Sequence, residues 1–146
     1  YGDHRDLHLS IRRQRQMCIR DRYLPQANTE TFVVGQIESR NLVDNIDELV
    51  AIDGLDGVVI GPYDLSGSYE LPGNIDHPTV VEAIQISIDK CREAGIYVGV
   101  GMGSSAATAK RWHAAGAHWA MVGADYQYMV QFADNLYSEI RSPESP

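Results

Sequence analysis

Short apolar runs alternate with longer amphipathic stretches along most of the chain. Four runs rich in β-branched or aromatic residues have the length of buried strands. They cover residues 31–37, 57–60, 97–100 and 119–122. Between and after them, apolar positions recur every three or four residues, which predicts helices. These helices cover 41–52, 78–94, 106–115 and 125–140, while the polar stretch 61–76 is predicted to be a long loop.

Residues that favour helix ends support these boundaries. Asn41 is a candidate cap for the first of these helices, and Pro78 is well placed at the first position of the next. Gly95 is expected to end that second helix, because glycine accepts the backbone conformation that follows a helix. Ser104 or Ser105 can cap the third helix.

Strand–helix repeats at this spacing predict a parallel sheet with right-handed crossovers. The pattern alone leaves two architectures open, an open doubly wound sheet and part of a (β/α)₈ barrel. A doubly wound sheet that binds a dinucleotide usually carries a glycine-rich first turn. The segment 99–103 is dense in glycine but lacks the full GxGxxG pattern, so a dinucleotide site is disfavoured.

The composition fits one globular domain. Apolar residues make up 44% and charged residues 22% of the 146 residues, and no run reaches the ~20 apolar residues of a membrane span. Cys18 and Cys91 lack the spacing of a zinc site or a disulfide framework. A reducing, cytoplasmic location is therefore expected.

Charge is unevenly distributed. Residues 1–22 hold six Arg and three Asp, a net +3, whereas residues 23–146 carry −11, which together give the total of −8. The acidic body argues against nucleic acid or a membrane as partner and suits an enzyme of small metabolites. The Arg-rich segment could be read as an arm that binds nucleic acid or as a targeting peptide, but it lacks the apolar region and cleavage signal of the latter. We predict instead that residues 1–22 do not belong to the fold, which begins near Tyr23.

Two carboxylates stand where parallel α/β proteins place their active sites, at the carboxyl ends of strands. Glu38 directly follows the first strand, and Asp64 lies four residues beyond the second. Two carboxylates on neighbouring strands, completed by water and substrate oxygens, suit Mg²⁺ or Mn²⁺. The alternative stays open that Asp64 caps a turn and Glu38 pairs with Arg40 in solvent. No nucleophile pattern of the Ser/His/Asp or Cys/His kind emerges.

Four motifs in order resemble those of the HpcH/HpaI aldolase/citrate lyase family of class II pyruvate aldolases. They are Gln36-Ile-Glu38, Gly61-Pro-Tyr-Asp-Leu-Ser66, Leu71-Pro-Gly-Asn-Ile-Asp-His-Pro78 and Val122-Gly-Ala-Asp125. The resemblance covers about residues 23–146 and implies the fifth to eighth strands of a (β/α)₈ barrel of roughly 250 residues. The chain would then be a truncated, C-terminal half-barrel.

The resemblance also implies a mechanism. Glu38 and Asp64 would bind a divalent metal, Mg²⁺ or Mn²⁺ with Co²⁺ as a further option, and pyruvate would chelate it. The substrate-binding residues implied are Gly61, Pro62, Tyr63 and Asp64, whose turn would hold the substrate carboxylate. The reaction would be retro-aldol cleavage of a 2-keto-3-deoxy or 4-hydroxy-2-oxo acid to pyruvate and an aldehyde. A homo-oligomer, a hexamer in the family, is implied for the complete protein.

The resemblance leaves part of the catalytic machinery unassigned. The family's acid–base His, its Asp partner and its substrate-binding Arg belong to the first half of the barrel, so no catalytic residue is identified here. Tyr63 stands where many dicarboxylate-cleaving members have a small residue, which indicates a different substrate. Two other hypotheses remain: an acyl-CoA lyase of the citrate lyase β type, and a truncated fragment without activity.

Overall fold

The computed structural model describes residues 24–142 of the chain. The chain divides into two compact units, residues 1–32 and residues 33–146. The described part of the first unit contains helix α2 (Leu24–Glu30). The prediction for the Arg-rich segment 1–22 lies outside the described residues.

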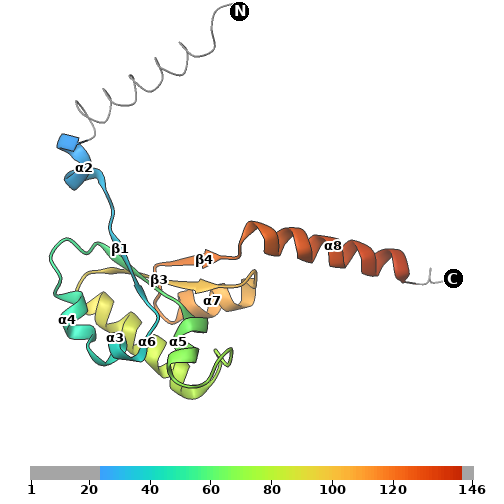
Figure 1. Ribbon diagram of the computed structural model, residues 1–146, viewed down its shortest axis with the longest axis horizontal. Coiled ribbons are helices and arrows are strands. Elements are labelled where there is room, and N and C mark those ends of the chain that lie inside the picture. The colour runs from blue at the N-terminus through green and yellow to red at the C-terminus, as the bar shows by residue number, and fades with distance from the viewer. Residues whose placement is uncertain (1–23, 143–146) are drawn as a thin grey trace, which may run out of the picture. The chain divides into compact units, whose positions relative to one another are not determined.

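The second unit contains a parallel sheet whose spatial order repeats the order of the sequence. Its strands are β1 (Val34–Ile37), β2 (Gly57–Ile60), β3 (Tyr97–Met102) and β4 (Trp119–Val122). The order is β1-β2-β3-β4, and every neighbouring pair is parallel (Figure 1). The predicted parallel sheet is therefore confirmed. A sequential order without reversal lacks the switch point that defines a doubly wound sheet.

The helices between the strands gather on one side of the sheet (Figure 1). They are α3 (Arg40–Asp44), α4 (Ile46–Val50), α5 (Pro62–Ser68), α6 (Pro78–Glu93) and α7 (Ala106–Ala114). The core forms between this layer and alternate strand residues. Its fully buried members include Val58, Ile60, Val98 and Val100 of the sheet and Val80, Ile84, Ile88 and Cys91 of α6. Burial raises the pKa of the Cys91 thiol to about 11, so this cysteine is a core residue and not a nucleophile.

The opposite face of the sheet is open. Val34, Tyr97 and Met121 point to that face and are 42%, 55% and 56% exposed. Glycines make part of this face flat, and the Trp119 ring lies over Gly99, where an added Cβ would come within 2.3 Å of it. Because parallel sheets are normally covered on both faces, this surface is the kind that a further layer of protein covers.

Helix α8 (Asp125–Arg141) follows β4 and has no buried residue. Its large apolar side chains are exposed instead, among them Met129, Phe132 and Ile140 at 67%, 70% and 73%. The side chains of Tyr128 and Gln127 bond to Val122 O and Ala124 N, which fixes the start of the helix. None of the helices in residues 24–142 is long and apolar enough to cross a membrane.

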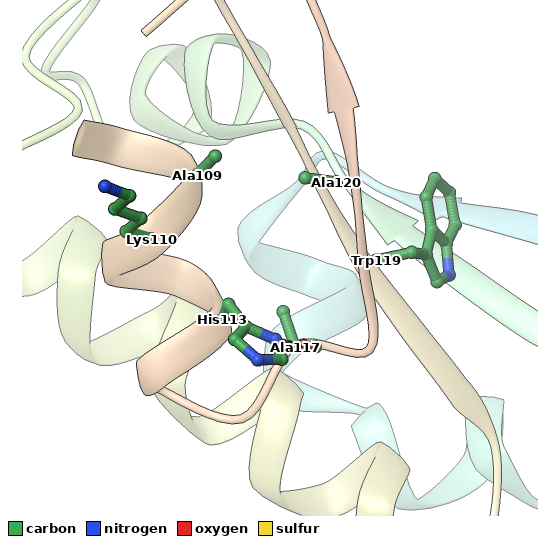
Figure 2. A pocket seen from close by; sticks show the side chains of 6 residues that line it. All are labelled: Ala109, Lys110, His113, Ala117, Trp119 and Ala120. Carbon is green, nitrogen blue, oxygen red and sulfur yellow. Dashed lines mark hydrogen bonds between the residues drawn. The ribbon is translucent and has the colours of Figure 1, made fainter. Parts of the chain in front are cut away.

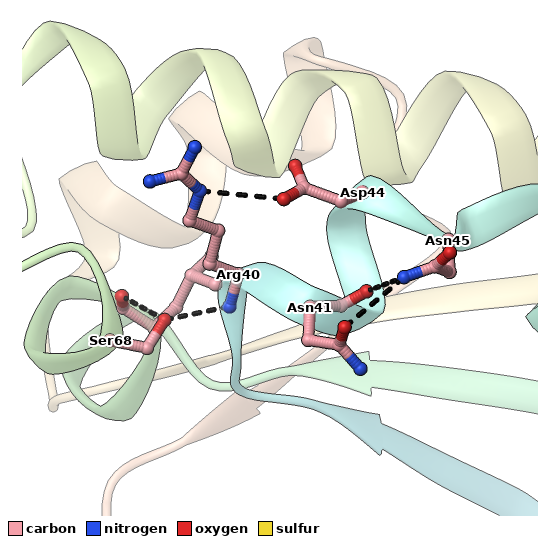
Figure 3. Close-up of polar contacts among 6 residues, drawn as sticks. Arg40, Asn41, Asp44, Asn45 and Ser68 are labelled. Carbon is pink, nitrogen blue, oxygen red and sulfur yellow. Dashed lines mark hydrogen bonds and ion pairs between the residues drawn. The ribbon is translucent and has the colours of Figure 1, made fainter.

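The predicted helix 41–52 is wrong in one respect, because it is two short helices. The break falls at Asn45, whose backbone leaves the helical region at φ −114° and ψ 30°. Its side-chain amide donates to Asn41 O at 2.8 Å, the same carbonyl that accepts from the Asn45 backbone N–H at 3.1 Å (Figure 3). The predicted cap Asn41 is also wrong, since Ser39 holds the N-cap position.

The predicted loop 61–76 is wrong at its start, where Pro62–Ser68 form helix α5. Proline at the first helical position favours this start, and the one glycine and two serines of the segment are typical of a loop. The predicted signals at the ends of α6 and α7 are confirmed. Pro78 begins α6, Gly95 follows its end with a φ of 75°, and Ser105 caps α7 by accepting from Thr108 N.

Candidate active site

The two predicted carboxylates emerge at the same edge of the sheet. Glu38 directly follows β1, and Asp64 lies in the first turn of α5, which starts just after β2. The strands run side by side in register up to Ile37 and Ile60. The ladder continues one step further, since Gly61 N–H donates to Ile37 O at 2.9 Å. The local fold therefore delivers both acidic side chains to one place.

Gly61 lies between these carboxylates and leaves space for them. A Cβ atom added to Gly61 would lie 3.7 Å from the Glu38 Cβ and 3.8 Å from the Asp64 Oδ2. It would also lie 3.3 Å from the Gln36 Nε2. The side chains of Gln36, Glu38 and Asp64 therefore all lie around the position that a side chain at Gly61 would occupy. The structure thus brings the two predicted carboxylate residues together.

Gln36 also belongs to the site, although the sequence indicated it only as part of a motif. Its Nε2 donates to the Glu38 Oε2 at 2.7 Å, which orients the carboxylate. Residues two apart on a strand point to the same face, so this period could have identified it. Residues from β3, β4 and α8 that also surround the site were missed because they are distant in sequence.

A cavity of about 250 Å³ opens beside these residues. Glu38 does not line it directly and adjoins it through its bond to Gln36. The cavity is built by the ends of all four strands and by the starts of α5 and α8. Its lining residues are Gln36, Gly61, Pro62, Tyr63, Asp64, Gly101, Gly103, Met121, Gly123, Ala124 and Gln127. All four predicted substrate-binding residues, 61–64, are among them.

A buried serine secures the turn that carries Asp64. The Ser66 hydroxyl is fully buried, donates to Tyr63 O at 2.6 Å and accepts from Gly73 N at 3.0 Å. The Ser66 carbonyl accepts from Leu71 N at 2.9 Å. These bonds tie the first turn of α5 to the loop that follows the helix, so the turn that carries Asp64 has a rigid support.

The donor set suits a hard divalent cation. Glu38 and Asp64 supply carboxylate oxygens, the ligands that Mg²⁺ and Mn²⁺ prefer, and both side chains are exposed to solvent. Among the described residues, no group of three or more His, Cys, Asp or Glu side chains could hold a metal. Two carboxylates with water and substrate oxygens in the other positions are sufficient for such an ion.

The described histidines do not belong to this site. His77 caps α6 by accepting from Thr79 N, and His118 Nδ1 accepts from Val98 N at 3.1 Å. The His113 Nδ1 lies 3.3 Å from Ala117 O. His113 also borders a second cavity of about 330 Å³ between α7 and β4 (Figure 2). That cavity has mostly apolar walls and no carboxylate, so it offers no comparable chemistry. Its lining residues are Ala109, Lys110, His113, Ala117, Trp119 and Ala120.

Comparison with known proteins found a family match and similar sequences. Residues 3–131 match the model of the HpcH/HpaI aldolase/citrate lyase family. A 2-keto-3-deoxy-L-rhamnonate aldolase of Klebsiella pneumoniae is 36% identical over 122 residues, which are 84% of this chain and 45% of that protein. A protein of the same name from Salmonella paratyphi A is 35% identical over 86% of this chain and 46% of its own.

Solved structures also resemble this chain. A HpcH/HpaI aldolase/citrate lyase family protein from Burkholderia cenocepacia superposes with a TM-score of 0.79 at 31% identity, over 85% of this chain and 48% of that one. Macrophomate synthase superposes with a TM-score of 0.71 at 22% identity, over 82% of this chain and 41% of that one, and shows likeness of fold alone. The chain spans a little under half the length of the relatives that it matches.

Proposed function

Because the chain belongs to the HpcH/HpaI aldolase/citrate lyase family, we propose that it acts in a carbon–carbon lyase. The proposed reaction is retro-aldol cleavage of a 2-keto-3-deoxy or 4-hydroxy-2-oxo acid to pyruvate and an aldehyde. The names of the related 2-keto-3-deoxy-L-rhamnonate aldolases support this substrate class. The observation that carries the proposal is the convergence of Glu38, Asp64 and Gln36 around Gly61.

Glu38 and Asp64 are proposed to hold a divalent cation, Mg²⁺, Mn²⁺ or Co²⁺. Such a cation supplies positive charge that stabilises the negative charge developing on pyruvate oxygens during cleavage. The Gln36 amide holds the Glu38 carboxylate in a fixed orientation through its 2.7 Å bond. The lack of a side chain at Gly61 keeps the space between the two carboxylates free.

The first turn of α5 is proposed to bind the substrate carboxylate. The N–H groups of Tyr63 and Asp64 lie in that turn, where a helix offers no acceptor of its own, and both residues line the cavity. Pro62 starts the helix without adding a donor that would need a partner. The Tyr63 side chain is 56% exposed at the cavity, where it can contact the aldehyde part of the substrate.

We further propose that the chain is the second half of a (β/α)₈ barrel. Three observations support this: the sequential strand order, the helices on one face only, and a length slightly under half that of the relatives. The other half would cover the open face and pair with the edge strands β1 and β4. The acid–base group of the reaction would come from that half, since no described histidine lies at the cavity.

The function is tested with the protein in D₂O. Pyruvate and Mn²⁺ are added, and exchange of the pyruvate methyl protons is followed by NMR. In the complete protein, whose other half would supply the acid–base group, we expect exchange that depends on the metal and release of pyruvate from 2-keto-3-deoxy sugar acids. Turnover of malyl-type CoA thioesters without any activity on free oxo acids would contradict the proposal and would favour an acyl-CoA lyase.

A homo-oligomer is proposed on the basis of α8. The large apolar side chains that this helix exposes, with Phe132 at 70% and Ile140 at 73%, are stabilised when they are buried against another protein surface. We expect the mass measured by sedimentation to exceed that of one chain. We also expect Phe132→Glu to lower that mass, because it places a charge on the apolar stripe. A monomeric wild-type protein would contradict this proposal.

A further inference from the structure

Helix α3 begins two residues after Glu38, and its first turn is capped from outside the helix. Ser39 stands at the N-cap position, but its side chain makes no capping hydrogen bond. The Arg40 N–H instead donates to the Ser68 Oγ at 2.7 Å, and Ser68 is the last residue of α5 (Figure 3). First-turn N–H groups have no acceptor on their own helix, so Ser68 supplies a cap from a neighbouring helix.

The Ser68 hydroxyl has a defined orientation for this role. It donates its own hydrogen to Leu65 O at 3.1 Å. A hydroxyl has one donor and two acceptor positions, so its lone pairs remain for the Arg40 N–H. Both bonds engage backbone atoms, which are better fixed than the ends of long side chains. The link between the two helices is therefore a direct one between α5 and the start of α3.

The hydrogen bond between Arg40 and Ser68 lies close in sequence to both carboxylates. Ser68 lies one helical turn after Asp64, and its bonding partner lies two residues after Glu38. Before the carboxylates in sequence, the last bond of the β1–β2 ladder joins Gly61 N to Ile37 O. The segments that carry the two carboxylates are thus joined at two points, one before and one after the acidic side chains.

Other contacts between these segments hold them less firmly. The Arg40 guanidinium lies 5.8 Å from the centre of the Tyr69 ring, and it also pairs within α3 with Asp44 at 3.4 Å, with side chains that are 65% and 57% exposed. Burial, followed by the Asp44 carboxylate, raises the pKa of Tyr69. Exposed pairs of this kind contribute little and tolerate many side-chain positions.

We propose that Ser68 is a positioning residue that sets the spacing between Glu38 and Asp64. By capping α3 from α5, its hydroxyl holds the backbone behind one carboxylate against the helix that carries the other. This inference rests on the proposed function, because the spacing matters only if both carboxylates bind one cation. It assigns to Ser68 an effect on metal affinity that exceeds its effect on stability.

The test compares three variants of the full chain by Mn²⁺ binding, measured from the EPR signal of free Mn²⁺. Ser68→Ala removes the cap and is expected to weaken Mn²⁺ binding about tenfold, the lower range for loss of a residue that orients metal ligands. Ser68→Thr keeps a hydroxyl and is expected to restore most of the affinity. Ser105→Ala is the matched control, since it removes a serine cap from α7, which carries neither carboxylate.

A second measurement separates positioning from stability. Amide hydrogen exchange at Arg40 should accelerate in Ser68→Ala, and melting temperatures should fall by similar amounts in Ser68→Ala and Ser105→Ala. If Ser68→Ala binds Mn²⁺ as tightly as the wild type, or if Ser105→Ala loses as much affinity, the positioning role is refuted. A wild-type chain that binds no Mn²⁺ would instead contradict the proposed function itself.

Discussion

In the complete protein, Glu38→Gln and Asp64→Asn are each expected to reduce metal-dependent proton exchange of pyruvate by about a thousandfold or more. A bound cation contributes several kcal/mol of charge stabilisation, and each ~1.4 kcal/mol corresponds to a factor of ten in rate. Each substitution removes one of the two anionic ligands while almost preserving its shape. Binding of Mn²⁺ by EPR and exchange of the pyruvate methyl protons by NMR should be lost together.

The same variants should keep their fold. Glu38 and Asp64 are exposed, and each substitution replaces a carboxylate with an amide of almost the same shape. We therefore expect a melting temperature close to that of the wild-type protein in metal-free buffer. Loss of function with an unchanged or raised melting temperature excludes unfolding as its cause.

Asp47→Asn is the matched control for charge. It also removes one exposed carboxylate, which pairs with Lys90 at 2.7 Å on the helical layer. Because such surface pairs are worth roughly 0–1 kcal/mol, this variant should show a small change in stability and normal exchange. Normal proton exchange in both Glu38→Gln and Asp64→Asn would show that the converging carboxylates have another role.

The elements that the sequence predicted well are those with a long and regular apolar pattern. Helix α6 combines a stripe from Val80 to Cys91 with Pro78 at its start and Gly95 at its end, so every local signal agrees. The break at Asn45 was missed because the apolar pattern continues across it, while the Asn45 backbone leaves the helical region. Helix α5 was missed because its composition resembles that of a loop.

The site residues also divide into those that the local sequence indicates and those that only the fold brings together. The placement of Glu38 and Asp64 at one edge could be predicted, because Glu38 directly follows the first strand, Asp64 lies four residues beyond the second, and parallel strands end at one edge of the sheet. Met121 and Gln127 could not be predicted, because they enter the cavity only through strand order and the start of α8. The support from Ser66 and Ser68 depends on side-chain hydrogen bonds across several residues, for which a single sequence holds no periodic signal.

Gly61→Ala is expected to weaken Mn²⁺ binding by roughly ten- to a hundredfold, the range for disturbed support of metal ligands. The new Cβ would approach the Gln36 Nε2 to 3.3 Å and so displace the amide that orients the Glu38 carboxylate. It would also take up space beside the Asp64 Oδ2, at 3.8 Å. Titration of the variant with Mn²⁺ and the pyruvate exchange assay measure the effect.

The backbone gives no reason for Gly61→Ala to unfold the protein. Gly61 has φ −99° and ψ 91°, which alanine adopts without strain, and the crowded atom is the end of the flexible Gln36 side chain. Gly67→Ala is the control within the same helix, since no atom lies within 4 Å of its added Cβ. It should leave Mn²⁺ affinity unchanged and raise stability by about 0.5–1 kcal/mol. If both variants bind Mn²⁺ like the wild type, the cation does not occupy the space between the carboxylates, because only Gly61→Ala changes that space.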